Sequence, residues 1–201
     1  MFVFRIQVLF LTLDIKDAVI AVFGMFFGPL SALTVALVSA ALEIVTDPQT
    51  GFYGFIMDVI SSAAFSLPIA AIYHRKKRLW TAALGLFSSI VAVTCAMMLA
   101  NYLITPFFMG ASRQEVVALI PTLFLPFNLT KAILNAGLVL VLYKPISVAF
   151  RQAGITHNHD ETAAAFKFQK KTVAVFAVGV ALIVAAVLYF ILKMNGTATF
   201  F

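Results

Sequence analysis

No charged side chain occurs between residues 172 and 192. A helix rises about 1.5 Å per residue, so roughly 20 apolar residues are enough to cross the hydrocarbon core of a bilayer. Other largely apolar runs cover residues 30–45, 52–73, 79–104 and 125–143. The hydrophobic pattern therefore predicts an all-α fold, a polytopic bundle of membrane helices.

The composition of the chain excludes a large soluble domain. Of its 201 residues, 63% are hydrophobic and 11% are charged, which is about half the charged fraction of typical soluble domains. In a soluble protein the net charge of +6 would indicate a nucleic-acid partner, but here the basic residues flank apolar runs and report membrane orientation. We expect a lipid bilayer as the environment and no nucleic acid as a partner.

The distribution of Lys and Arg predicts which helix ends face the cytoplasm, because short loops rich in these residues stay on that side. His74-Arg-Lys-Lys-Arg78 closes one apolar run, and residues 146–171 hold four more basic side chains. This distribution predicts a multi-pass protein of the cell membrane. In that orientation several polar side chains lie in the outer half of the protein, as expected for capture of an external ligand. These groups are Asp14, Asp17, Glu43, Asp47, Asp58, Asn101, Asn128 and Lys131.

The sequence 125–137 carries three polar side chains into an apolar run. Asn128, Lys131 and Asn135 lie at i, i+3 and i+7, so they share one face of a helix. A charged residue at the middle of a spanning helix costs roughly 2.5–3.5 kcal/mol, and it usually points into protein or a wet cavity. A lysine near a helix start can instead extend toward the membrane surface. The two asparagines on the same face favour a polar pocket.

Several kinds of chemistry have no support in the sequence. There is no Gly-x-x-x-x-Gly-Lys-Ser/Thr motif, so the chain cannot bind ATP through a P-loop. Cys95 is the one cysteine, and His157 and His159 are more typical of a solvated loop than of a metal site. No Ser-His-Asp or paired-carboxylate arrangement occurs on the outer side. We expect no enzyme activity, no metal and no cofactor.

Asparagine side chains suit the recognition of a flat ring. Each offers a donor and an acceptor side by side, which matches a heterocycle edge with adjacent N–H and C=O groups. Asn101 and Asn128 are the candidates for this role. Neighbouring aromatic side chains can stack on the ring faces, although each can equally face lipid or the core. They are Tyr102, Phe107, Phe108, Phe124 and Phe127.

Proline and glycine predict where the helices begin and end. Gly28-Pro29 separates the short apolar run 19–27 from the helix that follows, since proline is favoured at the first position of a helix. Pro106 and Pro145 indicate the ends of two spans, because proline inside a helix removes a hydrogen bond.

The segment 107–124 is expected to be an external loop. Within it, Ser112 and Glu115 have the spacing of a capping box, in which each side chain bonds to the backbone N–H of the other residue. This spacing predicts a short amphipathic helix over the outer surface.

Four motifs occur in a fixed order along the chain: Leu11-Thr-Leu-Asp14, Phe27-Gly-Pro29, Asn101-Tyr102 with Pro106, and Pro126-Phe-Asn-Leu-Thr-Lys131. Together they resemble the substrate-binding S components of energy-coupling factor (ECF) vitamin transporters, in particular the riboflavin-binding RibU family. The resemblance covers residues 11 to about 150.

The resemblance implies a six-helix protein of the bacterial cytoplasmic membrane that holds riboflavin near its outer face. The implied partners are a transmembrane T component and two ATPase subunits, which supply the missing P-loop. The implied domains are an S-component domain over residues 1–150, a cytoplasmic linker over 151–171 and an additional span over 172–193. By motif position, the ligand contacts would be Thr12, Asn101, Asn128 and Lys131.

Two departures from the family pattern stand out. The first family helix is absent or truncated, because only about ten residues precede Leu11, and we expect the reading frame to begin upstream of Met1. The small residues Ala32, Ala36 and Ala40 form a close-packing stripe, which would then lack its usual neighbour unless the added span 172–193 covers it.

Two alternatives to riboflavin capture remain at this point. One is an S component for another flat vitamin. The other is a structural or assembly subunit whose polar groups bond only to each other, with Lys131 paired to Asp58 or Glu43.

Overall fold

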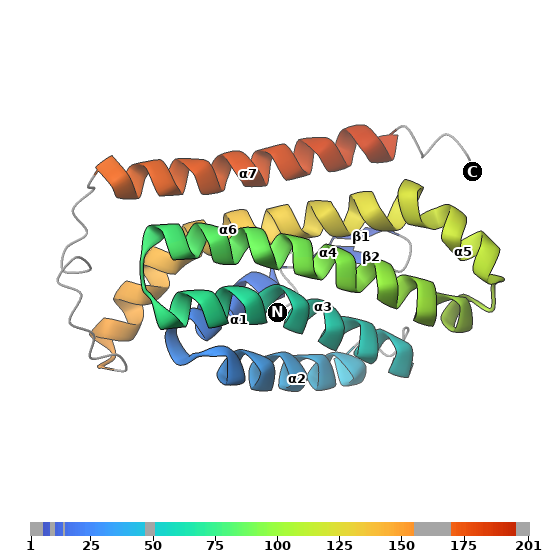
Figure 1. Ribbon diagram of the computed structural model, residues 1–201, viewed down its shortest axis with the longest axis horizontal. Helices are drawn as coiled ribbons and strands as arrows, with labels where there is room; N and C mark the ends of the chain where they lie inside the picture. Colours follow the sequence, from blue (N-terminus) through green and yellow to red (C-terminus); the bar gives the residue numbers. More distant parts are fainter. Residues whose placement is uncertain (1–5, 9–10, 14, 47–50, 155–169, 196–201) are drawn as a thin grey trace.

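The computed structural model describes residues 6–8, 11–13, 15–46, 51–154 and 170–195. These residues form long, roughly aligned helices, with α7 lying along α6 on one side of the bundle and α2 on the opposite side (Figure 1). The helices are α1 Lys16–Phe27, α2 Pro29–Thr46, α3 Gly51–Arg75, α4 Leu79–Met109, α5 Arg113–Leu119, α6 Leu125–Gln152 and α7 Lys170–Asn195.

The prediction of an all-α membrane bundle is confirmed. Within the described residues, four helical segments are long and apolar enough to cross a membrane: 51–75, 79–109, 113–150 and 173–192. One feature was not predicted, a small antiparallel hairpin before α1, in which β1 Ile6–Val8 pairs with β2 Leu11–Leu13.

The predicted ends of two spans were wrong. Helix α4 continues through Pro106 to Met109, and α6 continues through Pro145 to Gln152. A break in an apolar environment would leave backbone groups without partners, whereas neighbouring helices can accommodate the one bond that proline removes. Helix α4 ends instead at Gly110, which has a φ of 62° and donates its N–H to the carbonyl of Pro106.

The segment predicted as an external loop is mostly helical. The capping box is confirmed, since the Ser112 N–H donates to Glu115 Oε2 at 2.9 Å and the Glu115 N–H donates to Ser112 Oγ at 3.4 Å. Helix α5 is followed by a π-helical turn, η2 Ile120–Phe124, and then directly by α6. Such turns occur often at functional sites in proteins.

The small-residue stripe of α2 already has neighbours, so the expectation that it lacks one was wrong. Ala32, Ala36 and Ala40 are completely buried. A Cβ atom added at Gly24 of α1 would lie 2.7 Å from the Cβ of Ala32 and 2.9 Å from that of Ala70 on α3. Helices α1 and α3 therefore cover the stripe, and α7 packs on α6 instead.

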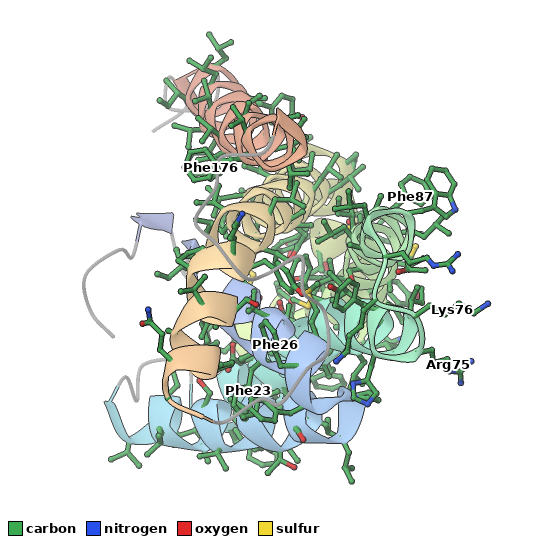
Figure 2. All side chains as sticks on the ribbon, turned by 90° about the vertical axis from the view of Figure 1, so that its left-hand side faces the viewer. Phe23, Phe26, Arg75, Lys76, Phe87 and Phe176 are labelled. Carbon is green, nitrogen blue, oxygen red and sulfur yellow. The ribbon has the colours of Figure 1, made fainter. Side chains whose placement is uncertain are left out.

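Aromatic side chains fill the end of the bundle that carries the basic turn at residues 75–78. Figure 2 looks onto this end, with Phe23 and Phe26 inside and Arg75 and Lys76 pointing outward. Phe26 stacks on Tyr143 with ring centroids 5.2 Å apart. We call this end the basic end.

Candidate functional site

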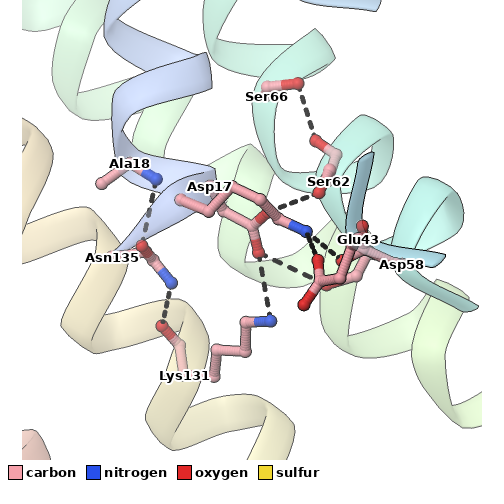
Figure 3. Close-up of polar contacts among 10 residues, drawn as sticks. Asp17, Ala18, Glu43, Asp58, Ser62, Ser66, Lys131 and Asn135 are labelled. Atoms are coloured by element: carbon pink, nitrogen blue, oxygen red, sulfur yellow. Dashed lines mark hydrogen bonds and ion pairs between the residues drawn. The ribbon is translucent and has the colours of Figure 1, made fainter. Parts of the chain in front are cut away.

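The start of α1 holds a charged side chain that joins three helices. The Lys16 ammonium donates to Glu43 Oε2 on α2 at 2.7 Å and also to Asp58 Oδ1 on α3 (Figure 3). Only 9% of the Lys16 side chain is exposed. Since Glu43 is near the end of α2 and Asp58 near the start of α3, these contacts lie in the half of the bundle away from the basic end.

Asp17 lies next to Lys16 and is buried between α3 and α6. Its Oδ1 atom accepts from Ser62 Oγ at 2.6 Å, and its Oδ2 atom accepts from Ser61 Oγ at 3.4 Å. The Lys131 ammonium on α6 lies 3.4 Å from the same Oδ2 atom. A buried carboxylate needs such partners, because burial without them costs several kcal/mol. We call Lys16, Asp17, Glu43, Asp58 and Lys131 the charged cluster.

Asn135 attaches α6 to the first turn of α1. Its Oδ1 atom accepts from the backbone N–H of Ala18 at 3.0 Å, and its Nδ2 group donates to the carbonyl of Lys131 at 3.1 Å. The first N–H groups of a helix have no partner within the helix. Asn135 therefore acts as a cap that is supplied by another helix.

The predicted polar face of α6 points into the protein. Asn128, Lys131 and Asn135 are 3%, 9% and 1% exposed, so Lys131 does not extend to the membrane surface. Its partner differs from the acids named in the structural-subunit alternative. Lys131 pairs with Asp17, while Asp58 and Glu43 bind Lys16, because the start of α1 inserts between α3 and α6.

The two asparagines proposed for ring recognition are buried on neighbouring helices, α4 and α6. Asn101 donates to the carbonyl of Met97 at 2.7 Å and accepts from Thr105 Oγ1 at 3.0 Å. Asn128 donates to the carbonyl of Phe124 at 2.8 Å. Among the residues that the structure describes, none donates a hydrogen bond to the side-chain oxygen of Asn128. That oxygen is available to a ligand.

The fourth predicted contact, Thr12, belongs to the hairpin that precedes α1. Its backbone in β2 pairs with Gln7 of β1. The side chain of Thr12 lies outside the described part of the structure. Asn101, Asn128 and Lys131 are thus the predicted contacts whose side chains the structure places inside the bundle.

The aromatic candidates differ in burial, and Phe108 is half-buried, between a buried pair and an exposed pair. Phe124 and Phe127 are buried, with 0% and 4% exposure, whereas Tyr102 and Phe107 are 37% and 64% exposed. The Arg113 guanidinium lies over the Tyr102 ring, 5.8 Å from its centroid. The buried pair is therefore better placed to contact a ligand beside Asn128.

Sequence reasoning missed the roles of Lys16, Ser61 and Ser62. None of these three side chains was among the predicted site residues. The available signal was that Lys16 and Asp17 directly precede a short apolar run, where charges need partners from other helices.

No group of three or more His, Cys, Asp or Glu side chains suited to a metal occurs among the described residues. His157 and His159 lie outside those residues. The charged cluster mixes two lysines with its acids, so its carboxylates are already engaged by ammonium groups.

Buried polar side chains inside a helical membrane bundle are typical of membrane receptors and transporters. Residues 1–143 match the family described as ECF transporter, substrate-specific component. This match covers well over half of the chain, and the protein belongs to that family. No match was found among curated proteins or among solved structures.

Family membership fixes the general function. The protein is a substrate-specific membrane subunit of an ECF transporter, and this family is not enzymatic. Membership implies partnership with the T component and the ATPase components of such a transporter. The family match ends before α7.

Proposed function

We propose that the protein captures riboflavin from outside a bacterial cell for import by an ECF transporter. The observation that carries the proposal is the side-chain oxygen of the buried residue Asn128, which accepts no hydrogen bond from the described residues and lies on the same helix face as Lys131. The flavin ring has an edge of alternating C=O and N–H groups. An unused acceptor beside a lysine donor complements such an edge.

Each proposed contact has a defined role. Asn101 and Asn128 read the ring edge, and Lys131 donates to a carbonyl or hydroxyl oxygen of the ligand. Lys131 lies 3.4 Å from Asp17, so a ligand oxygen can compete for its ammonium while Asp17 keeps Ser61 and Ser62 as donors. Thr12 contributes from the hairpin that leads into α1.

The membrane arrangement follows from the charges. The basic end faces the cytoplasm, and the charged cluster lies in the outer half, where an external ligand arrives. Residues 1–150 form the S-component domain, 151–171 the cytoplasmic linker and 172–193 the additional span. The complete importer contains this protein, the T component and two ATPase subunits.

Equilibrium binding to the purified protein tests the proposal directly. Riboflavin fluorescence should be quenched on mixing, and flavin analogues should compete for the site. A panel of other vitamins, added as competitors, provides the control for specificity. Absence of quenching together with tight binding of a different vitamin would overturn the riboflavin assignment and keep the family function.

One observation favours the structural-subunit alternative: in this structure Lys131 is engaged by Asp17 within a closed network. A purely structural network predicts that no vitamin changes the thermal unfolding midpoint of the protein. A ligand that binds only the folded state raises it, by an amount set by the ligand concentration and the dissociation constant. Thermal unfolding with and without each vitamin separates the two functions.

A further inference from the structure

Helix α7 contacts the bundle through one narrow stripe of its surface. Gly179 and Ala186 are buried, while Leu188 and Leu192 are 54% and 75% exposed. Gly179, Ile183, Ala186 and Phe190 follow one another at steps of four, three and four residues, so they lie along one side of the helix. The rest of α7 presents apolar side chains outward, as expected for a helix that faces lipid.

The stripe is fixed to α6 by a reciprocal contact between two glycines. A Cβ atom added at Gly137 would lie 2.7 Å from the carbonyl oxygen of Gly179, and one added at Gly179 would lie 2.9 Å from the carbonyl oxygen of Gly137. Any larger residue at either position would force the backbones apart. The backbones of α6 and α7 therefore lie very close together at these two glycines.

A second contact lies closer to the candidate site. The rings of Phe127 on α6 and Phe190 on α7 pack edge to face, with centroids 6.4 Å apart. Phe127 is ten residues from Gly137, and Phe190 is eleven residues from Gly179. Both spacings correspond to about 15–17 Å along a helix, so the two contacts are in register on antiparallel helices (Figure 1).

Phe190 also reaches the residues that hold Asn128. It packs against a buried cluster made by Val116, Phe124 and Phe127. The carbonyl of Phe124 accepts the hydrogen bond from the Asn128 side chain. Phe127 directly precedes Asn128 in α6. Phe190 thus packs on the cluster that contains both the residue whose carbonyl binds the Asn128 side chain and the residue that precedes Asn128 in the chain.

We infer that α7 is a wall of the ligand site and that Phe190 is a positioning residue, which holds Phe124 and Phe127 in place and thereby orients the Asn128 side chain. The identity of the ligand rests on the proposed function. The position of α7 as a wall beside Asn128 does not depend on which ligand binds. Helix α7 lies beyond the part of the chain that matches the family. The site of this protein is therefore built partly by a helix that lies outside the segment matching the family.

The first experiment compares riboflavin binding by Phe190→Ala and Tyr189→Ala in the full chain. Tyr189 is the matched control, because it is an aromatic residue at the same depth with 45% exposure. Loss of an aromatic pair should weaken binding by Phe190→Ala about two- to tenfold, while Tyr189→Ala stays within twofold of the unchanged protein. Phe190→Leu, which keeps an apolar side chain, should recover most of the affinity. Equal affinities for Phe190→Ala and Tyr189→Ala overturn the inference.

The second experiment needs no ligand. A single cysteine is placed at the site by Asn128→Cys in a Cys95→Ala background, and its labelling by N-ethylmaleimide is timed. Adding Phe190→Ala should speed labelling several-fold, and adding Tyr189→Ala should not. An unchanged labelling rate would overturn the inference that α7 is a wall of the site. If riboflavin does not bind the unchanged protein, the proposed function fails, and the labelling result still decides the inference.

Discussion

The two ends of the bundle are held together by different chemistry. At the basic end, Phe26 stacks on Tyr143, whose hydroxyl group lies 2.6 Å from that of Tyr73. In the opposite half, the charged cluster joins α1, α2, α3 and α6 by ion pairs. Aromatic packing depends little on any single polar group, whereas each member of a buried charge network depends on its partners. The charged half therefore offers more contacts for which a polar ligand can compete than the basic end does.

The largest effect is expected from removing one charge of the buried network. Lys131→Met takes away an ammonium group from Asp17, whose side chain is 2% exposed. Breaking a buried ion pair by removal of one partner costs about 3–5 kcal/mol. The free energy of unfolding, measured for the purified protein in detergent, should fall by about this amount.

The double variant Asp17→Asn with Lys131→Met is the control for charge. It removes the negative charge of Asp17 together with the ammonium group of Lys131, so no buried carboxylate is left unpaired by the loss of Lys131. We expect it to be more stable than Lys131→Met alone. Additive losses from the two single changes would show that the pair is not coupled.

The second prediction compares two asparagines on the same face of α6. Asn128→Leu should weaken riboflavin binding roughly ten- to hundredfold, because an unpaired ligand group costs about 1–3 kcal/mol. Asn135→Leu should change affinity less, since Asn135 lies about 10 Å deeper along the helix and its side chain caps α1 at Ala18. Its main effect should be a loss of stability.

Thr130→Val is the matched control for Asn128→Leu. Thr130 is also a buried polar residue of α6, and its hydroxyl group donates to the carbonyl of Pro126 within the same helix. It lies two residues from Asn128 and so faces another side. Riboflavin affinity should be unchanged in this variant. Equal losses of affinity at Asn128 and Asn135 would indicate a deeper pocket.

Much of the fold could be predicted because it depends on local signals. The apolar runs, the Gly28-Pro29 junction and the capping box at Ser112 each specify an element by short-range physics. The same local reasoning failed at Pro106 and Pro145. There the cost of leaving backbone groups unpaired in an apolar environment outweighed the one hydrogen bond that each proline removes.

The candidate site was predicted less completely than the fold. The spacing of Asn128, Lys131 and Asn135 on one helix face could be seen in the sequence, and their burial agrees with it. The partner of Lys131 could not be seen, because Asp17 is more than a hundred residues away and both Asp58 and Glu43 were equally plausible. Contacts between distant segments depend on how α1 inserts into the bundle, which no local pattern encodes.

The third prediction concerns the basic end. Tyr143→Phe removes the hydroxyl group that pairs with Tyr73 and keeps the ring that stacks on Phe26. Net loss of one such hydrogen bond should lower the free energy of unfolding by about 0.5–1.5 kcal/mol. Riboflavin affinity should not change. A loss of affinity comparable to that of Asn128→Leu would show that the two ends of the bundle are coupled.

The smallest effect is expected at the exposed edge of the charged cluster. Glu43 is 25% exposed at its side chain, and Lys16 keeps Asp58 as a partner when Glu43 is changed. Partly exposed ion pairs contribute about 0–1 kcal/mol and are screened by salt. Glu43→Gln should therefore lower stability by less than about 1 kcal/mol, and the difference from the unchanged protein should shrink at high salt.

Asp58→Asn, at a more buried carboxylate, should be more destabilising and less sensitive to salt. Unfolding of both variants at low and high salt checks this order. A larger loss of stability for Glu43→Gln than for Asp58→Asn would mean that Lys16 depends mainly on Glu43. Helix α2, and not α3, would then be the main partner of the start of α1.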